Sequence, residues 1–398
     1  MTKTLRIVMV LPEPPVPFGG AAARWFYVLL CGMVARGHRV TTFCPAPDTD
    51  GGLETLRGTL PASVYDIRAF PSIQKSGWKS KLASLARPYS YMFSSEFQQH
   101  LDQELGKGFD VLHLEQLWSG WTGLDHCAKA SLHVHYNLFR DLGGEKANSW
   151  REWVLRKRLA QSERFLLRRY STISCLSEPL RDHIQKISPQ ADVHVVPLGI
   201  DSALYPYAGK TRASDSVTIG LVGSFNWLPS LQAGRRLLAS LWPAIRERIP
   251  NARLLIAGRQ ARTAFAGHTD QPAIDIFENV ADILPFFRQL DVMLYAPHDA
   301  SGTKVKVQEA FALGVPVVTT PSGVEGLEAR DGIHVCVAES DGDLVEKTIV
   351  LLQDPERRHR QAQAARELIC ATCSPEVTTK KMEAVFHSIA SKQPGGNQ

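Results

Sequence analysis

The chain has 398 residues, and because a compact domain averages about 150 residues, this length predicts two or three structural units rather than one small binding module. Hydrophobic residues make up 44% and charged residues 21% of the chain, which excludes a largely disordered, collagen-like or coiled-coil protein. The net charge is only +5, and without a recognition module this argues against a nucleic-acid-binding protein.

The seven cysteines are an odd number and mostly isolated, which indicates reduced thiols in a cytoplasmic setting. Cys370 and Cys373 form a C-x-x-C, but no second pair or histidine cluster accompanies them, so we expect a structural role and no zinc. Near the N-terminus, the apolar run Ile7–Leu11 ends at Pro12, far short of the ~20 residues that span a bilayer. We therefore expect neither an export signal nor a membrane span.

The first half of the chain alternates short apolar runs with helical segments. Leu5–Leu11 predicts a strand, Ala21–Val34 has apolar residues at helical spacing, and Val40–Phe43 predicts the next strand. Further strands are predicted at Val111–Leu114, Leu132–His135, Thr172–Leu176 and Val193–Val196. The intervening segments are long enough for crossover helices, so the pattern predicts a parallel sheet wrapped by helices.

A stretch rich in turn-forming residues, Asp201–Ser216, interrupts this alternation and predicts a linker. A second set of strands follows, predicted at Val217–Val222, Arg253–Ala257, Asp291–Ala296, Val315–Thr319 and His334–Val337. We therefore predict an α/β protein with two Rossmann-like parallel-sheet domains, 1–205 and 206–374, with a C-terminal helix at about 375–390 packing back on the first. Ligands in such sheets bind outside the carboxyl ends of the strands, so we expect the two domains to face each other across a cleft.

The strongest local signal is the segment Tyr295–Leu327, which predicts a strand end, a loop, a helix and a buried strand. A helix opening with Gly302, Thr303 and Lys304 would present free N–H groups, a positive dipole end and an ammonium to a diphosphate. Glu309, about 1.5 turns further on, could accept hydrogen bonds from sugar hydroxyls beside it. The alternative is a capped surface helix with solvated lysines.

Short motifs in a fixed order resemble a known family, the retaining glycosyltransferases of the GT-B fold that use sugar nucleotides, in the large bacterial group 1 (family 4-like) set. In the second half these motifs are IGLVGSFNWLPS, LLIAGR, FENVADILPFFRQLDVMLYAP and GTKVKVQEA, and in the first half PFGG, HLE, HYN, CLSE and VPLGID. One such motif would be weak evidence, whereas the ordered set covers most of the chain. The resemblance implies two Rossmann-like domains and transfer of a sugar from a nucleoside diphosphate sugar.

The resemblance also implies roles for individual residues. Gly19 and Gly20 would let the first loop approach the donor, the alternative being a tight turn. Val280 would contact the nucleotide base, and Glu309 matches the second glutamate of the family's E-x7-E motif, which holds the ribose. Ser301 stands at the position of the first glutamate. This departure weakens any inference about contacts to the donor sugar.

The family's usual Arg and Lys after the first strand of the second domain are not evident, and Ser224, with Asn226 and Pro229, occupies that loop. Lys304 would supply positive charge instead, with Arg259 either a second contributor or a surface residue. His135, at the carboxyl end of a predicted strand, matches the family's histidine near the reacting sugar. We expect it to orient or stabilise the sugar rather than act as a nucleophile, the alternative being a structural histidine.

The segment Trp150–Tyr170 contains seven Arg or Lys residues and two Glu among apolar side chains. Such a helix can lie on an anionic membrane, or it is an ordinary solvated helix. It is the basis for expecting a cytoplasmic protein with peripheral contact to the inner face of the membrane. We expect no bound cofactor and no metal, because the chain has no Asp-x-Asp cluster and helix N–H groups with Lys304 can meet the charge of the leaving group.

Taken together, these features predict a retaining glycosyltransferase that uses a nucleoside diphosphate sugar and a glycan or lipid-linked acceptor in envelope or exopolysaccharide synthesis. Two alternatives remain open at this point. A sugar-nucleotide epimerase would turn over its donor without an acceptor. A catalytically degenerate sugar-nucleotide-binding protein, suggested by Ser301, would bind the donor without transferring the sugar.

Overall fold

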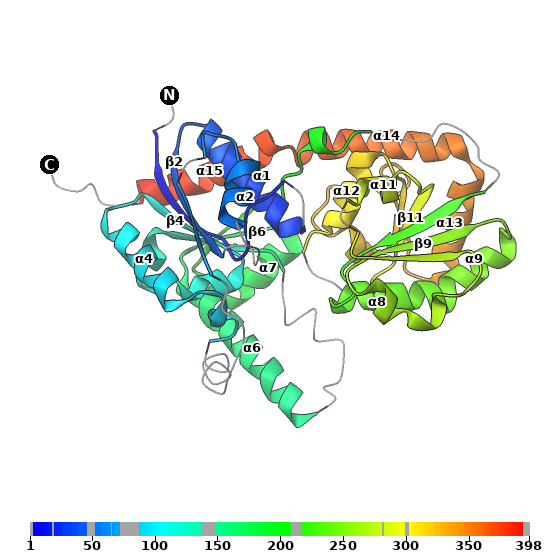
Figure 1. Cartoon of the computed structure of the whole chain (residues 1–398), viewed down its shortest axis with the longest axis horizontal. Helices are drawn as coiled ribbons and strands as arrows, with labels where there is room; N and C mark the ends of the chain where they lie inside the picture. Colours follow the sequence, from blue (N-terminus) through cyan, green and yellow to red (C-terminus); the bar gives the residue numbers. More distant parts are fainter. Residues whose placement is uncertain are drawn as a thin grey trace. The chain divides into compact units, whose positions relative to one another are not determined.

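The computed structural model describes residues 3–17, 20–45, 52–64, 66–71, 87–136, 149–207, 216–280, 282–298 and 302–392. The chain divides into two compact units. The first unit consists of residues 1–139, 145–199 and 375–398, and the second of residues 140–144 and 200–374. Each unit is an α/β domain built on its own sheet, and Figure 1 shows both by their element labels.

The first unit contains a seven-stranded parallel sheet in the order β3-β2-β1-β4-β5-β6-β7. Its strands are β1 (Arg6–Val10), β2 (Arg39–Pro45), β3 (Ile67–Phe70), β4 (Val111–Glu115), β5 (Ala130–Val134), β6 (Thr172–Cys175) and β7 (Asp192–Val195). The central strands β4, β5 and β6 are buried along their whole length, as parallel strands covered on both faces must be. Their near-continuous apolar runs are the reason that the sequence predicted them.

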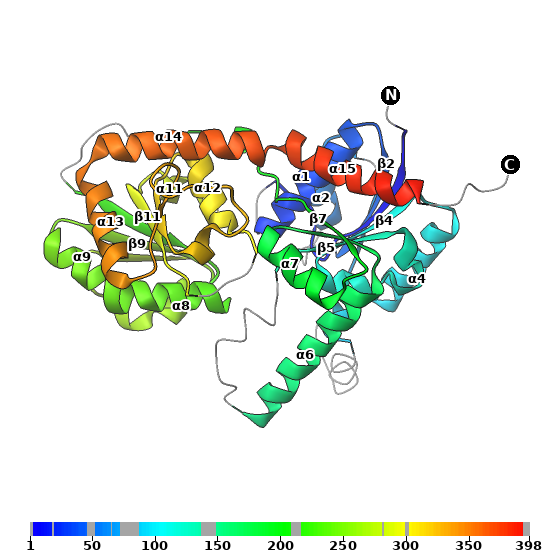
Figure 2. The same cartoon turned by 180° about the vertical axis from the view of Figure 1, so that it is seen from behind.

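Helices cover both faces of this sheet. They are α1 (Ala21–Ala35), α2 (Gly52–Thr59), α4 (Ser95–Gly106), α6 (Trp150–Arg169), α7 (Glu178–Ile187) and α15 (Pro375–Ser391). Serine side chains cap α4, α6 and α7 by accepting a backbone N–H of the first turn, the usual role of serine before a helix. The last helix, α15, packs against α1 and over β4 and β5 (Figure 2).

The second unit contains a six-stranded parallel sheet in the order β10-β9-β8-β11-β12-β13. Its strands are β8 (Thr218–Val222), β9 (Arg253–Gly258), β10 (Ile274–Glu278), β11 (Val292–Tyr295), β12 (Val317–Thr319) and β13 (Cys336–Val337). Its helices are α8 (Leu228–Arg236), α9 (Trp242–Arg248), α10 (Ala261–Ala264), α11 (Leu284–Phe287), α12 (Val305–Leu313), α13 (Asp341–Gln353) and α14 (Pro355–Thr372). Two parallel-sheet α/β domains were predicted, and this architecture is confirmed.

In both sheets the chain adds strands first to one side of the first strand and then to the other. The reversal lies between β1 and β4 in the first unit and between β8 and β11 in the second. In doubly wound sheets ligands bind beside such a reversal, at the carboxyl ends of the strands. The loops after these four strands are therefore the places to search for a site in each unit.

Candidate functional site

The start of α12 was predicted to bind phosphate. The helix begins at Val305, with Lys304 as its N-cap. Gly302 has a φ of 72°, and its N–H donates to Oε1 of Glu325 at 3.0 Å. The ammonium of Lys304 donates to the carbonyl oxygen of Gly302, and Thr303, between them, is partly buried. The N–H of Gly302 and the ammonium of Lys304, both expected to meet a phosphate, therefore already have partners within the protein.

Glu309 lies in the second turn of α12 and is 6% exposed. The phenol of Tyr205, itself buried, donates a hydrogen bond to its Oε1 at 3.1 Å. Burial of a carboxylate is costly unless it is hydrogen-bonded, and Tyr205 supplies such a partner. The helix and the tyrosine together fix the orientation of this carboxylate.

The first turn of α12 also carries Lys306, a lysine that the sequence analysis did not place in the site. Nζ of Lys306 donates to the hydroxyl of Ser230 in α8 at 2.7 Å and lies 4.3 Å from the ring centroid of Tyr295. Burial and the neighbouring charge of Lys304 lower the pKa of Lys306 to about 7, against the attraction of Glu309. This ammonium is held beside the ends of β8 and β11.

The other predicted donor residues follow three adjacent strands. Ser224, after β8, donates to Oδ1 of Asn226 at 2.8 Å. Arg259, after β9, and Val280, after β10, are both exposed. The close approach of the first two loops requires Gly258, because a Cβ there would come 1.6 Å from the carbonyl oxygen of Gly223. All three residues follow the carboxyl ends of their strands, the edge at which such sheets bind ligands.

In the first unit, the glycine-rich loop after β1 leads into α1. Gly20 is the N-cap of α1 with a φ of −67°, which any residue can adopt. A Cβ there would meet Glu13 at 3.7 Å, an ordinary contact. Nothing in the described surroundings of Gly20 therefore demands glycine. Gly19 and Ser301 lie outside the described residues.

Four side chains converge on the carboxylate of Glu115, the last residue of β4. Its Oε1 accepts hydrogen bonds from Trp25 Nε1 at 2.9 Å, His113 Nε2 at 2.9 Å and His133 Nδ1 at 3.2 Å, and its Oε2 accepts one from His135 Nε2 at 2.8 Å. The carboxylate is fully buried. It lies at the reversal of the first sheet and ties β4, β5 and α1 together.

The protonation of this cluster follows from its contacts. Burial alone would raise the pKa of Glu115, but His133 and the hydrogen bonds from the three histidines outweigh it and hold the pKa well below its ordinary value. Burial lowers the pKa of His135, although Glu115 opposes the shift. A carboxylate only accepts, so Nε2 of a neutral His135 carries the hydrogen and Nδ1 keeps its lone pair. The side chain of His135 is 8% exposed, whereas those of His113 and His133 are fully buried.

Two family models together match most of the chain. The model of Glycosyltransferase Family 4 matches residues 18–204, and that of the glycosyl transferases group 1 matches residues 216–354. The chain belongs to the glycosyltransferases of the GT-B fold. A search of curated proteins by sequence finds no similar relative for this glycosyltransferase.

Solved structures share the fold at low sequence identity. A sucrose-phosphate synthase from Thermosynechococcus elongatus aligns with a TM-score of 0.73 at 14% identity, covering 97% of this chain and 99% of that one. HepE from Anabaena, solved with UDP and glucose, aligns with a TM-score of 0.67 at 14% identity, covering 96% and 100%. WaaG, a glycosyltransferase of lipopolysaccharide biosynthesis, aligns with a TM-score of 0.64 at 18% identity, covering 95% and 98%.

Two groups of side chains in this glycosyltransferase have the spacing of metal ligands, among the residues that the structure describes. The first is His113, Glu115 and His133. A metal-bound histidine normally donates its other N–H to an acceptor, yet His113 Nδ1 and His133 Nε2 are buried without a hydrogen-bond partner among the described residues. The other ring nitrogen of each histidine, His113 Nε2 and His133 Nδ1, is already hydrogen-bonded to Glu115. The surroundings of this group therefore do not fit a metal.

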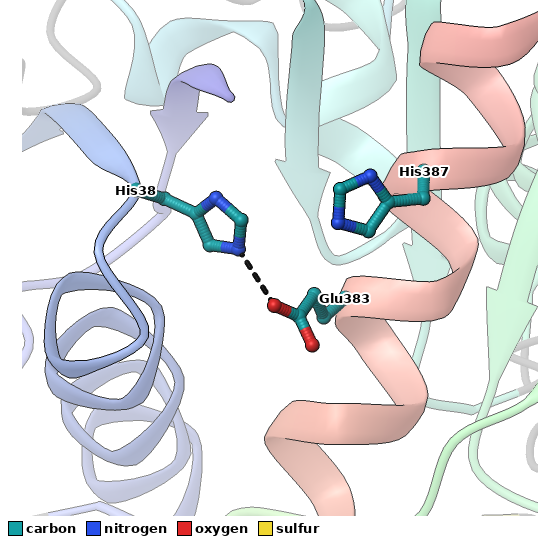
Figure 3. A group of neighbouring side chains, drawn as sticks. All are labelled: His38, Glu383 and His387. Atoms are coloured by element: carbon teal, nitrogen blue, oxygen red, sulfur yellow. Dashed lines mark hydrogen bonds and ion pairs between the residues drawn. The ribbon is translucent and has the colours of Figure 1, made fainter. Parts of the chain in front are cut away.

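The second group, His38, Glu383 and His387, joins α15 to the rest of the first unit (Figure 3). The backbone N–H of Leu5 donates to Nδ1 of His38 at 3.1 Å, so Nε2 carries the hydrogen and donates to Glu383 at 3.0 Å. Arg36 also donates to Glu383, at 2.8 Å. A metal would have to displace that hydrogen and lie beside a guanidinium. This group is better explained as the tie that holds α15 to the start of β2.

The sequence analysis included Glu115 only as part of the HLE motif, and it did not place Lys306 in the site. Glu115 and His135 are separated by 20 positions in the chain, and only the pairing of β4 with β5 brings them together. An acidic residue ending a buried strand was the available signal, because burial of a carboxylate requires partners. For Lys306 the available signal was its position in the first turn of the predicted helix.

Proposed function

We propose that this glycosyltransferase moves a sugar from a nucleoside diphosphate sugar to a hydroxyl group of a glycan or lipid-linked acceptor, with retention of the anomeric configuration. The observation that carries the proposal is the buried carboxylate of Glu309, which lies in α12 and is oriented by Tyr205. The domain that contains it matches the group 1 glycosyltransferases. A fixed carboxylate is suited to accept hydrogen bonds from the two ribose hydroxyls of a nucleotide.

Two neighbouring structures support this donor class. HepE was solved with UDP and glucose and, in a second structure, with UDP-glucose. We extend the donor class, a nucleoside diphosphate sugar, to this chain and leave the sugar and base to be identified by experiment. Ser224, Arg259 and Val280 are proposed donor contacts because they follow β8, β9 and β10 at the same edge.

In the first unit we assign His135 to the reacting sugar. Glu115 fixes its ring through Nε2–H, which leaves the lone pair of Nδ1 to accept a hydrogen bond from a sugar hydroxyl. Retention is accounted for by attack on the same face as the departing diphosphate, whose oxygen accepts the proton of the acceptor hydroxyl. His135 is thus a positioning and stabilising group, and no covalent intermediate is required.

We further propose that α6 brings the enzyme to anionic lipid, in an envelope or exopolysaccharide pathway. Trp150 is 71% exposed and Trp153 51% exposed, and the ammonium of Lys157 lies 3.9 Å from the Trp153 ring centroid. Exposed tryptophans beside basic residues are typical of helices that lie at a membrane interface. Within the described residues, no helix combines the length and apolar character needed to cross a membrane.

A donor screen tests the proposal. A ligand present at 100 times its dissociation constant stabilises the folded protein by about 2.7 kcal/mol. We expect one of UDP-, GDP-, ADP- or TDP-sugars to raise the Tm, and turnover of that donor to depend on an added acceptor. Turnover to an isomerised donor without acceptor would favour the epimerase alternative, whereas binding without transfer to any acceptor would favour the degenerate binding protein.

His135→Ala separates chemistry from donor binding. We expect turnover to fall by about 10²-fold or more while donor affinity changes little, since the donor is assigned to the second unit. Tm, donor affinity and turnover are measured on the same preparation. A wild-type rate would contradict the role of His135, and an early melting transition with scattered parameters would indicate a structural histidine.

A further inference from the structure

Lys306 lies where the second sheet reverses. Gly223 directly follows β8 and Tyr295 ends β11, the two strands on either side of the reversal. Nζ of Lys306 is 2.7 Å from the Ser230 hydroxyl and 4.3 Å from the Tyr295 ring centroid, and a Cβ on Gly223 would meet it at 3.2 Å. Its position is therefore at the place where doubly wound sheets bind their ligands.

The described contacts of this ammonium are neutral. The hydroxyl of Ser230 and the ring of Tyr295 touch it, and no carboxylate of the described residues lies within ion-pair distance of it. Burial and Lys304 lower its pKa to about 7, and the attraction of Glu309 does not cancel the shift. A partly buried cation without an anionic partner is unfavourable, and an anion bound beside it would remove that cost.

The other expected cations are poorly placed for the same task. The ammonium of Lys304 is engaged by the Gly302 carbonyl, and the N–H of Gly302 is engaged by Glu325. Residues 223–230, from the end of β8 into α8, contain no basic side chain. Lys306 thus places its charge beside a loop that supplies none of its own.

We propose that Lys306 is the cation that binds the diphosphate of the nucleotide donor. The inference rests on the proposed function and adds the residue that grips the leaving group. Bound diphosphate stabilises the protonated ammonium, so the leaving group would meet a full positive charge as its own negative charge develops. Lysine acts here as a compact point charge on a flexible stem, held in place by Ser230.

A dependence on pH follows. The free ammonium titrates near pH 7, so diphosphate affinity should fall as the pH rises from 7 to 9, where the phosphates themselves are fully ionised. The groups facing Lys306 are Lys304 and Glu309 from α12, the Ser230 hydroxyl from α8 and the Tyr295 phenol from β11. Of these four, none has an ordinary pKa between 7 and 9.

Isothermal titration of UDP, GDP, ADP and TDP into the full-length protein identifies the nucleoside diphosphate that binds. The same nucleotide and its nucleoside are then titrated into Lys306→Gln, Lys304→Gln and Lys347→Gln. Lys347, in α13, pairs with Asp331 and serves as the matched control. We expect Lys306→Gln to lose about 10- to 100-fold in diphosphate affinity, the range for one charged hydrogen bond, with nucleoside affinity unchanged. Lys347→Gln should bind as the wild-type protein does, and Lys304→Gln, which removes a charge that lowers the pKa of Lys306, should not reproduce the loss.

Lys306→Arg keeps the charge at every pH and should bind diphosphate without the decline between pH 7 and 9. If Lys306→Gln does not fold, the pH dependence of diphosphate binding by Lys306→Arg still tests the role of Lys306. Wild-type affinity in Lys306→Gln, or a decline with pH that persists in Lys306→Arg, would overturn the inference and leave the proposed function intact. Failure of the wild-type protein to bind any of the four diphosphates would overturn both.

Discussion

Replacing Glu115 with glutamine changes one atom and removes the charge of a buried side chain that accepts four hydrogen bonds. The amide oxygen can keep the three hydrogen bonds that Oε1 receives from Trp25, His113 and His133. The amide NH₂ then faces His135 Nε2, which sits 2.8 Å from Oε2 in the native protein. Two donors cannot share that distance, so His135 must move its hydrogen to Nδ1 or give up the contact.

The expected cost follows from these contacts. A hydrogen bond to a charged group contributes about 1.5–3 kcal/mol and one to a neutral group about 0.5–1.5 kcal/mol. Losing the charge across four bonds, which are not additive, should destabilise the protein by about 2–4 kcal/mol. For a unit of 150–250 residues this corresponds to a Tm lower by about 4–16 °C. The variant should still fold, because its volume is unchanged and three of the four bonds survive.

Turnover should respond more strongly than stability does. Moving the hydrogen of His135 to Nδ1 replaces the proposed acceptor with a donor, so we expect turnover to fall at least about 10²-fold with donor affinity nearly unchanged. Melting curves, donor titration and sugar transfer are measured on one preparation. Glu104→Gln is the matched control, since this buried glutamate in α4 pairs with Arg68 and Lys107 instead. Wild-type turnover in Glu115→Gln would refute the reasoning.

Acid should act through the same group. The folded-state pKa of Glu115 lies below its ordinary 4.5, so its stabilisation is present above pH 4.5 and is lost as the pH falls below it. The folded-state pKa of His135 lies below its ordinary 6.5, so its contribution also declines as the pH falls below 6.5. Urea midpoints between pH 7 and 3 should decline in the wild-type protein and decline less steeply below pH 4.5 in Glu115→Gln, in which the other carboxylates with lowered pKa values still titrate.

The remaining predictions concern the donor helix and α6. Glu309→Gln should weaken donor binding about tenfold or more. Tyr205→Phe, which removes the 3.1 Å hydrogen bond to Glu309, should weaken it by less. Wild-type nucleotide affinity in both variants would remove Glu309 from the site. Changing residues 156–158 to glutamine should reduce co-sedimentation with anionic liposomes at low salt, because each basic residue contributes about 1 kcal/mol to binding. Liposome binding that is unaltered by the change would favour the interpretation of α6 as a solvated helix.

The two sheets were predictable because parallel strands are buried on both faces, which leaves apolar runs in the sequence. The strands that sequence analysis missed, β3 and β10, are edge strands of their sheets and carry partly exposed residues. Charged residues interrupt their apolar runs: Arg68 in β3, and Asp275 in β10, which forms an ion pair with Arg253. The proposed donor helix was predicted from glycine, threonine and lysine at its start, although it begins at Val305.

Side-chain direction accounts for what sequence could not supply in the candidate site. Lys304 and Lys306 are two positions apart, and either could meet a phosphate at a helix start. Only the structure shows that the first turns to the Gly302 carbonyl and the second to Ser230 and Tyr295. The carboxylate of Glu115 likewise gains its partners from strand pairing, since three of its four donors come from other elements or positions far away in the chain.

The central claim is transfer of a sugar from a nucleoside diphosphate sugar with retention, and the anomer released by the enzyme tests it most directly. Proton NMR follows the purified protein with the donor that stabilises it, first with water and then with added glycan acceptors. The account predicts release of the nucleoside diphosphate and a first-formed product with the donor's own anomeric configuration. Release of the opposite anomer, or no cleavage of any of the four donors with any acceptor, would contradict it.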